Sequence, residues 1–132
     1  MHGETNLDTL LRQLKPLVRP EVFVFCTVPH AEYGDLASTN PFASIREEEG
    51  LTLVLVQEQA DKIEMPYNGV FRCITLSVHS SLEAVGLTAV ISTKLAEHQI
   101  SANMLAGFHH DHVFVPAHQI ESAIQILTSL TQ

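Results

Sequence analysis

The fold follows from the stretch Phe71-Arg72-Cys73-Ile74-Thr75-Leu76-Ser77-Val78-His79-Ser80-Ser81-Leu82-Glu83-Ala84-Val85-Gly86-Leu87. Apolar residues share one face of residues 70–78 at a period of two, with Arg72 as the exception, which predicts a strand over 71–78 with one buried side. After the polar turn, apolar residues recur at spacings of three and four: Leu87, Val90, Ile91 and Leu95. This spacing predicts an amphipathic helix from about residue 82 to residue 98.

The turn between this strand and this helix is a candidate ligand site. Ser80 and Glu83 have the spacing of a capping box, in which each side chain accepts from the other residue's backbone N–H. Unpaired N–H groups and the helix dipole at such a start favour an anion, and a carboxylate would fit. The alternative is that Ser80 and Glu83 only cap the helix, while Gly86 allows close helix packing.

Length and composition restrict the classes of function. The chain has 132 residues, of which 45% are hydrophobic and 17% charged, so it is globular and forms one ordinary domain or two very small ones. Its 15 acidic and 7 basic residues give a net charge of -8, and Lys and Arg form no cluster. These features exclude direct nucleic-acid binding and attraction to an anionic membrane surface as expected functions.

The cysteines and the N-terminus predict a cytoplasmic protein. Cys26 and Cys73 lie in apolar segments far apart in the sequence, which favours buried thiols in a reducing compartment over a disulfide. The first residues lack the basic and apolar pattern of a signal peptide, and no apolar stretch is long enough to span a membrane.

The remaining pattern predicts two small halves, residues 1–67 and residues 68–132. In the first half we expect a helix over 7–14 capped by Asn6 or Thr5, a strand over 22–28, a loop over 29–41 with a short strand around Leu36-Ala37, a hairpin of 44–48 with 51–56 that turns at Glu49-Gly50, and a helix over 58–64. In the second half we expect further strands over 101–107 and 112–116 and a closing helix over 117–130.

The two halves resemble each other, which favours a duplicated α+β unit. Residues 22–30 parallel residues 71–79, and residues 50–56 parallel residues 111–115. The first half lacks a full helix after its first strand. It has Tyr33-Gly34-Asp35 where the second half has Val85-Gly86-Leu87.

The order of these motifs resembles that of ACT domains, regulatory modules with a βαββαβ fold that bind amino acids. The resemblance rests on the strand, polar turn and Gly86-Leu87, on Leu95-Ala96-Glu97-x-x-Ile100-Ser101, and on the hairpin and closing helix. Glu47-Glu48-Glu49-Gly50-Leu51-Thr52-Leu53-Val54 is similar to a stretch of small bacterial tandem-ACT proteins of unassigned function. The resemblance implies an α+β, ferredoxin-like fold of two ACT-like halves, with antiparallel sheets and helices packed on one face.

The resemblance also implies where a ligand sits, because ACT effectors lie at the turn between the first strand and the first helix. The family's acidic residue shortly before Gly-Leu matches Glu83, whereas Val85 stands where a proline is common. We expect an amino acid or a related small carboxylate as ligand. The candidate binding residues are His79, Ser80, Ser81, Glu83, Val85, Gly86, Leu87, Asn103 and Met104, with Asp35, Ser38 and Thr39 from the first half.

Other functions are weaker expectations. His109, His110 and His112 with Asp111 could hold Zn or Ni, although a polar hairpin turn explains the same string and we assign no metal site. No cofactor is expected, and no catalytic motif is present, so we expect a non-catalytic protein. A homodimer is expected because small sheets leave open edges, and a ligand-free interaction module is the remaining alternative.

Overall fold

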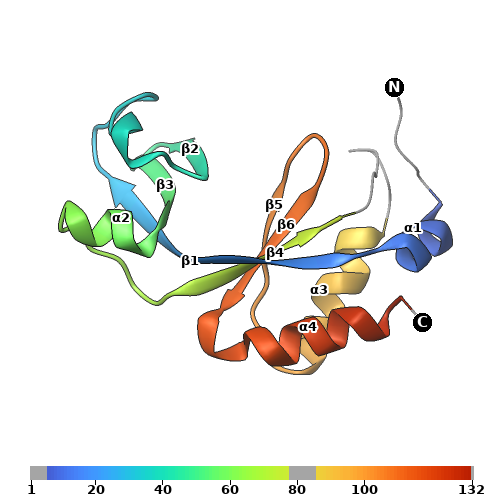
Figure 1. Ribbon diagram of the computed structural model, residues 1–132. Helices are drawn as coiled ribbons and strands as arrows, with labels where there is room; N and C mark the ends of the chain where they lie inside the picture. Colours follow the sequence, from blue (N-terminus) through green and yellow to red (C-terminus); the bar gives the residue numbers. More distant parts are fainter. Residues whose placement is uncertain (1–5, 78–85, 132) are drawn as a thin grey trace. The chain divides into compact units, whose positions relative to one another are not determined.

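The computed structural model describes residues 6–77 and 86–131 (Figure 1). Helices and strands alternate in a mixed α+β order, and the strand pairs β1–β3, β2–β3 and β5–β6 are antiparallel, as predicted. The elements are α1 (Leu7–Gln13), β1 (Pro16–Val28), the 3-10 helix η1 (Ala37–Thr39), β2 (Ala43–Glu47), β3 (Gly50–Val56), α2 (Gln57–Lys62), β4 (Phe71–Leu76), α3 (Leu87–Glu97), β5 (Asn103–Ala106), β6 (Asp111–Pro116), η2 (Ala117–Gln119) and α4 (Ile120–Ser129).

The chain forms two compact units, one inserted into the other along the sequence. The C-terminal unit consists of Met1–Pro20 and Arg72–Gln132, and the inserted unit of Glu21–Phe71. Strand β1 therefore contributes its first residues to one unit and its remaining residues to the other. The domain boundary predicted between residues 67 and 68 stays a prediction.

Strand β1 is longer than the sequence pattern predicted. It begins at Pro16, whereas the sequence predicted a strand over 22–28. Its start is tied to β4: the Ser77 N–H donates to the Lys15 carbonyl oxygen at 2.9 Å, and Arg72 Nη2 donates to the Arg19 carbonyl oxygen at 2.9 Å. Proline lacks only its N–H, so it is tolerated in a strand where that donor is not needed.

The C-terminal unit has the strand order β1-β4-β6-β5, with α3 and α4 side by side against one face of the sheet (Figure 1). Alternate residues of β4 and β6 point toward the helices. The helices pack apolar residues spaced three and four apart against them. The buried core comprises Leu10, Leu14, Ile74, Leu76, Leu87, Ile91, Leu95, Ile100, Val113, Val115, Ile120, Ala123 and Leu127. The predicted periodicity is thus confirmed for Ile74 and Leu76 of β4 and for Leu87, Ile91 and Leu95 of α3, whereas Val90 lies outside this core. The prediction that the strand has one buried side is wrong, because Cys73 and Thr75 on its other face are buried as well.

The start of α1 agrees with the sequence, whereas the closing helix predicted from residue 117 begins as the 3-10 helix η2 and becomes α4 at Ile120. The Thr9 N–H donates to Asn6 Oδ1 at 3.0 Å, which confirms Asn6 as the cap of α1. Helix α3 begins at Leu87, and Gly86 precedes it in the left-handed region with φ of 100°. The Ser80–Glu83 capping box and the predicted helix start near residue 82 lie outside the described residues.

The inserted unit is an antiparallel sheet of strand order β2-β3-β1, with α2 after β3. Its core comprises Val24, Cys26, Leu51, Leu53, Leu55 and Ala60. The predicted hairpin is confirmed, but its turn is Glu48-Glu49, because Gly50 already pairs with Glu47 in the ladder. The short strand predicted at Leu36-Ala37 is wrong: Leu36 has φ of 61°, outside the strand region, and the 3-10 helix η1 follows it.

Candidate functional site

A cavity of about 510 Å³ lies beside the loop that joins β1 to β2 in the inserted unit. Its volume falls in the range of about 300–1,000 Å³ that is typical of small-molecule sites. It is lined by Tyr33, Gly34, Asp35, Ala37, Pro41, Phe42, Ala43, Ser44 and Leu53. The loop supplies most of these residues, and the neighbouring hairpin supplies the rest.

Local hydrogen bonds give this loop its shape. The Glu32 N–H donates to Asp35 Oδ2 at 2.9 Å, and the Asp35 N–H donates back to the Glu32 carbonyl oxygen at 2.9 Å. Gly34 has φ of 96° and Leu36 φ of 61°, so the chain passes through the left-handed region twice in three residues. Glycine adopts this conformation without strain, which explains the residue at position 34.

The end of the loop is anchored to the sheet. The Phe42 N–H donates to the Val54 carbonyl oxygen at 2.8 Å, and the Phe42 ring meets Phe23 edge to face at a centroid distance of 5.2 Å. Phe23 is fully buried. The aromatic wall of the cavity is therefore held by the core, which fixes one side of any site here.

The candidates from the first half have different positions in this loop. Asp35 lines the cavity. Ser38 is exposed and Thr39 is buried, and neither is among the lining residues; the Thr39 hydroxyl donates to the Leu36 carbonyl oxygen at 2.7 Å. Thus the structure brings Asp35 to the cavity and gives Thr39 a structural contact within η1.

Most candidates from the second half, His79, Ser80, Ser81, Glu83 and Val85, lie outside the described residues. Gly86 and Leu87 are described. A Cβ atom on Gly86 would meet Leu7 Cδ2 at 3.1 Å, and Leu87 is buried in the core of the C-terminal unit. Gly86 therefore allows α1 to pack closely against the start of α3. This is the alternative, structural role that the sequence suggested for this glycine.

Asn103 and Met104 lie on strand β5 and point to opposite faces. Met104 packs against the core of the C-terminal unit, whereas Asn103 is exposed and its Nδ2 lies 3.4 Å from the Phe114 carbonyl oxygen. Asn103 pairs with Phe114 in the β5–β6 ladder. Met104 therefore contributes to the core, and Asn103 faces the solvent.

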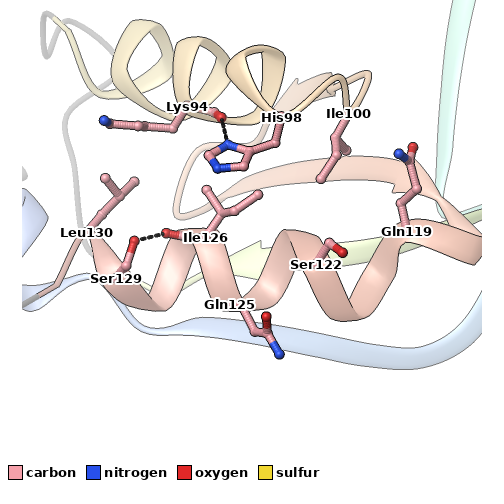
Figure 2. Close-up of a pocket in the computed structure, with 9 residues that line it drawn as sticks. All are labelled: Lys94, His98, Ile100, Gln119, Ser122, Gln125, Ile126, Ser129 and Leu130. Carbon is pink, nitrogen blue, oxygen red and sulfur yellow. Dashed lines mark hydrogen bonds between the residues drawn. The ribbon is translucent and has the colours of Figure 1, made fainter.

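A second cavity, of about 600 Å³, lies between α3 and α4 of the C-terminal unit (Figure 2). His98 Nδ1 lies 2.9 Å from the Lys94 carbonyl oxygen, and since a carbonyl only accepts, Nδ1 donates and Nε2 can meet a ligand. Figure 2 shows the imidazole reaching from α3 toward Ile126 on α4. The Lys94 ammonium lies 3.6 Å from Glu97 Oε1. The described residues that line this interhelical cavity include Lys94 and His98 but no acidic residue.

The histidine string forms a hairpin turn and the start of β6. His112 Nδ1 lies 3.0 Å from Thr75 Oγ1, on the neighbouring strand β4. Burial lowers the pKa of His112, with Arg19 and His110 adding to the effect, and burial raises the pKa of Asp111. Across residues 6–77 and 86–131, no three His, Cys, Asp or Glu side chains are grouped so that they could hold a metal ion.

Both cysteines are buried thiols, as predicted from their apolar surroundings. Burial raises the pKa of the Cys26 thiol, which disfavours the reactive thiolate. In the described part of the chain, no helix is long and apolar enough to cross a membrane.

Sequence reasoning missed most of the cavity lining. Tyr33 and Gly34 were visible as part of a loop bounded by Pro29 and Pro41, so the polar and Gly-rich composition was an available signal. No sequence signal pointed to Leu53 and Ser44, because the register of β2 and β3, in which Ser44 pairs with Leu53, brings them to the cavity.

Two sequence models of the ACT domain match the chain, one over residues 2–72 and the other over residues 70–129. This chain belongs to the ACT domain family. The two matches together span nearly all of the sequence, so the tandem ACT arrangement expected from the motifs is confirmed. Membership supports a regulatory, ligand-binding role.

Solved structures agree with this assignment. A Vibrio cholerae protein of unknown function, described as a possible transport protein, is 47% identical, with a TM-score of 0.88 and 96% of each chain covered. An Agrobacterium tumefaciens protein is 14% identical, with a TM-score of 0.75 and 89% of each chain covered. The regulatory subunit of aspartate kinase from Thermus thermophilus is 8% identical, with a TM-score of 0.60, covering 90% of this chain and 99% of that one.

The last two likenesses concern the fold alone, since the identities are low. With them, the predicted ferredoxin-like ACT fold is confirmed. No functionally curated protein matches the sequence.

Proposed function

We propose that this protein is a non-catalytic regulatory module that binds a free amino acid or a related small carboxylate at the turn after the first strand of each ACT half. In the first half Asp35 is the principal binding residue proposed, and those of the second half are His79, Ser80, Ser81, Glu83, Val85, Gly86 and Leu87. The ligand shifts the population of two arrangements and thereby changes the surface offered to a partner.

One observation carries the proposal: the two glycines that the internal duplication aligns both have a positive φ. Gly34 and Gly86, which the internal duplication aligns, have φ of 96° and 100°. Each is followed by a helical segment, η1 in the first half and α3 in the second. A cavity of about 510 Å³ accompanies the turn in the inserted unit, where the family resemblance expects an effector.

We also propose that the protein is cytoplasmic and forms a homodimer. Buried thiols suit a reducing compartment. Light scattering measures the molar mass of the purified protein, with and without the ligand, and so detects a dimer. A monomer at micromolar concentration under both conditions contradicts this part of the proposal.

The test of binding is the thermal stability of the full chain against each of the twenty amino acids at millimolar concentration. A ligand at about 100 times its Kd stabilises the folded state by about 2.7 kcal/mol, which a melting curve detects readily. We expect stabilisation by one amino acid or a few related ones. If no amino acid stabilises the protein, the proposal of a free amino acid as ligand fails.

Matched variants assign the site. Asp35→Asn removes the charge but keeps an oxygen that can accept from the Glu32 N–H, so the loop is retained. Glu58→Gln removes an equal charge from exposed α2 of the same unit and serves as its control. The double variant Ser80→Ala and Ser81→Ala tests the second turn. Gly86 is unsuitable for substitution, because its φ and its contact with Leu7 mean that a side chain would disturb folding.

A further inference from the structure

We infer that the cavity of the inserted unit selects a ligand that carries an ammonium group and an apolar, preferably aromatic, side chain. This inference rests on the proposed function and adds the class of ligand. It excludes acidic amino acids such as aspartate from this cavity.

The charge of the lining decides the polar part of the ligand. Among the described residues that line the cavity, Asp35 alone carries a charge. Its carboxylate accepts one backbone N–H through Oδ2 and can accept further donors. An ammonium group supplies such donors and forms charge-assisted hydrogen bonds, which are roughly twice as strong as neutral ones.

The same charge disfavours a second carboxylate at the side-chain end of the ligand. The lining contains no Lys or Arg to pair with it, and the chain as a whole carries a net charge of -8. A partly buried carboxylate beside Asp35 would experience both repulsion and desolvation. Aspartate and glutamate are therefore poor ligands for this cavity.

The apolar walls of the cavity favour an apolar side chain on the ligand. Phe42 and Pro41 are apolar lining residues, Leu53 lies buried behind them in the core of the unit, and Phe42 is fixed by its contact with Phe23. Tyr33 also lines the cavity but is 85% exposed, so its ring remains available to a ligand. An aromatic side chain buries most area against such walls, and an ammonium group near Tyr33 gains a cation–π interaction.

The experiment uses four probes on the full-length protein, with affinities measured by isothermal titration calorimetry. L-phenylalanine carries ammonium, carboxylate and ring, whereas phenethylamine lacks the carboxylate and 3-phenylpropionate lacks the ammonium. L-aspartate carries the second carboxylate. We expect phenylalanine and phenethylamine to bind, and 3-phenylpropionate and aspartate to bind at least about tenfold more weakly, as the loss of a charge-assisted hydrogen bond requires.

Variants locate the effect. Asp35→Asn should weaken phenethylamine binding by about tenfold or more, whereas Glu58→Gln should leave it unchanged. Tyr33→Phe should keep the affinity, and Tyr33→Leu should lower it, because only the former retains the ring. Circular dichroism spectra of each variant verify that it is folded.

The outcomes separate this inference from the proposed function. If 3-phenylpropionate binds as tightly as phenethylamine, or if aspartate binds more tightly than phenylalanine, the inference is overturned while amino-acid binding stands. An Asp35→Asn variant with unchanged affinity also overturns it, since the ligand then lies elsewhere. Binding of phenethylamine without that of any amino acid supports the inference and contradicts the proposed function.

Discussion

Gly50→Ala should destabilise the inserted unit strongly, because no side chain fits at the start of β3. Gly50 has φ of 151°, and a Cβ atom there would lie 2.6 Å from the Val28 carbonyl oxygen and 2.9 Å from Pro29 Cα. Both contacts are with backbone, so neither can be relieved by rotating a side chain. A backbone held in a sparsely populated region costs about 1–3 kcal/mol, and overpacking adds about 1–3 kcal/mol.

The sum of about 2–6 kcal/mol is large beside the total stability of about 5–15 kcal/mol that is usual for a domain. Urea unfolding monitored by tyrosine fluorescence reports the stability of the inserted unit, because both tyrosines of the chain, Tyr33 and Tyr67, lie in that unit. We expect a lower midpoint with an unchanged slope.

Gly34→Ala is the matched control in the same unit. Gly34 also has a positive φ, 96°, but a Cβ atom there would have nothing within 4 Å. Only the backbone strain of about 1–2 kcal/mol should remain. The difference between the two variants isolates the contact of Gly50 with the end of β1. Equal losses of stability at the two positions would refute the reasoning.

Three further perturbations test the C-terminal unit. Asn6→Ala removes the acceptor for the Thr9 N–H and should cost about 1 kcal/mol in urea unfolding followed by circular dichroism. Leu95→Ala removes a fully buried side chain and should cost about 2–5 kcal/mol, whereas Leu95→Met should cost less than about 1.5 kcal/mol. Because burial lowers the pKa of His112 in the folded state, the unfolded chain binds a proton first as the pH falls below about 6.5, and stability should fall with it. His112→Gln should flatten this dependence between pH 5 and 7, and a slope equal to that of the natural protein would contradict the assignment.

Local pattern predicted the identity of most elements. Asn6 caps α1 and the apolar stripe of α3 faces the core, because both effects depend on residues within one or two helical turns. The hairpin of β2 and β3 followed from strand-forming residues on either side of a polar turn. Its turn was misplaced by one residue, since Gly50 looked like a turn residue but is required by the close approach of Val28.

Longer-range pairing was harder to predict. The segment 16–20 contains two prolines, and its contacts with residues far along the chain, such as the hydrogen bond from Arg72 to the Arg19 carbonyl oxygen, accompany its place in a strand. For the candidate site, Asp35 was predicted and lines a cavity, but Phe42 and Leu53 were missed. Of the second predicted turn, the described residues include only Gly86 and Leu87.

By itself, the sequence determined the family, the α+β class and the periodic faces that build the core, because side-chain periodicity is set by the local geometry of helix and strand. The tertiary structure decided that residues 1–20 join the C-terminal unit and that Ser44 and Leu53 meet the loop around Asp35. These features depend on strand register and on left-handed backbone at Leu36 and Asn40. The register is not encoded in a single stretch of side chains, because it arises from contacts between segments that are separate in the sequence. The left-handed residues belong to a loop shaped by local hydrogen bonds, but no residue-type signal at Leu36 marks that conformation.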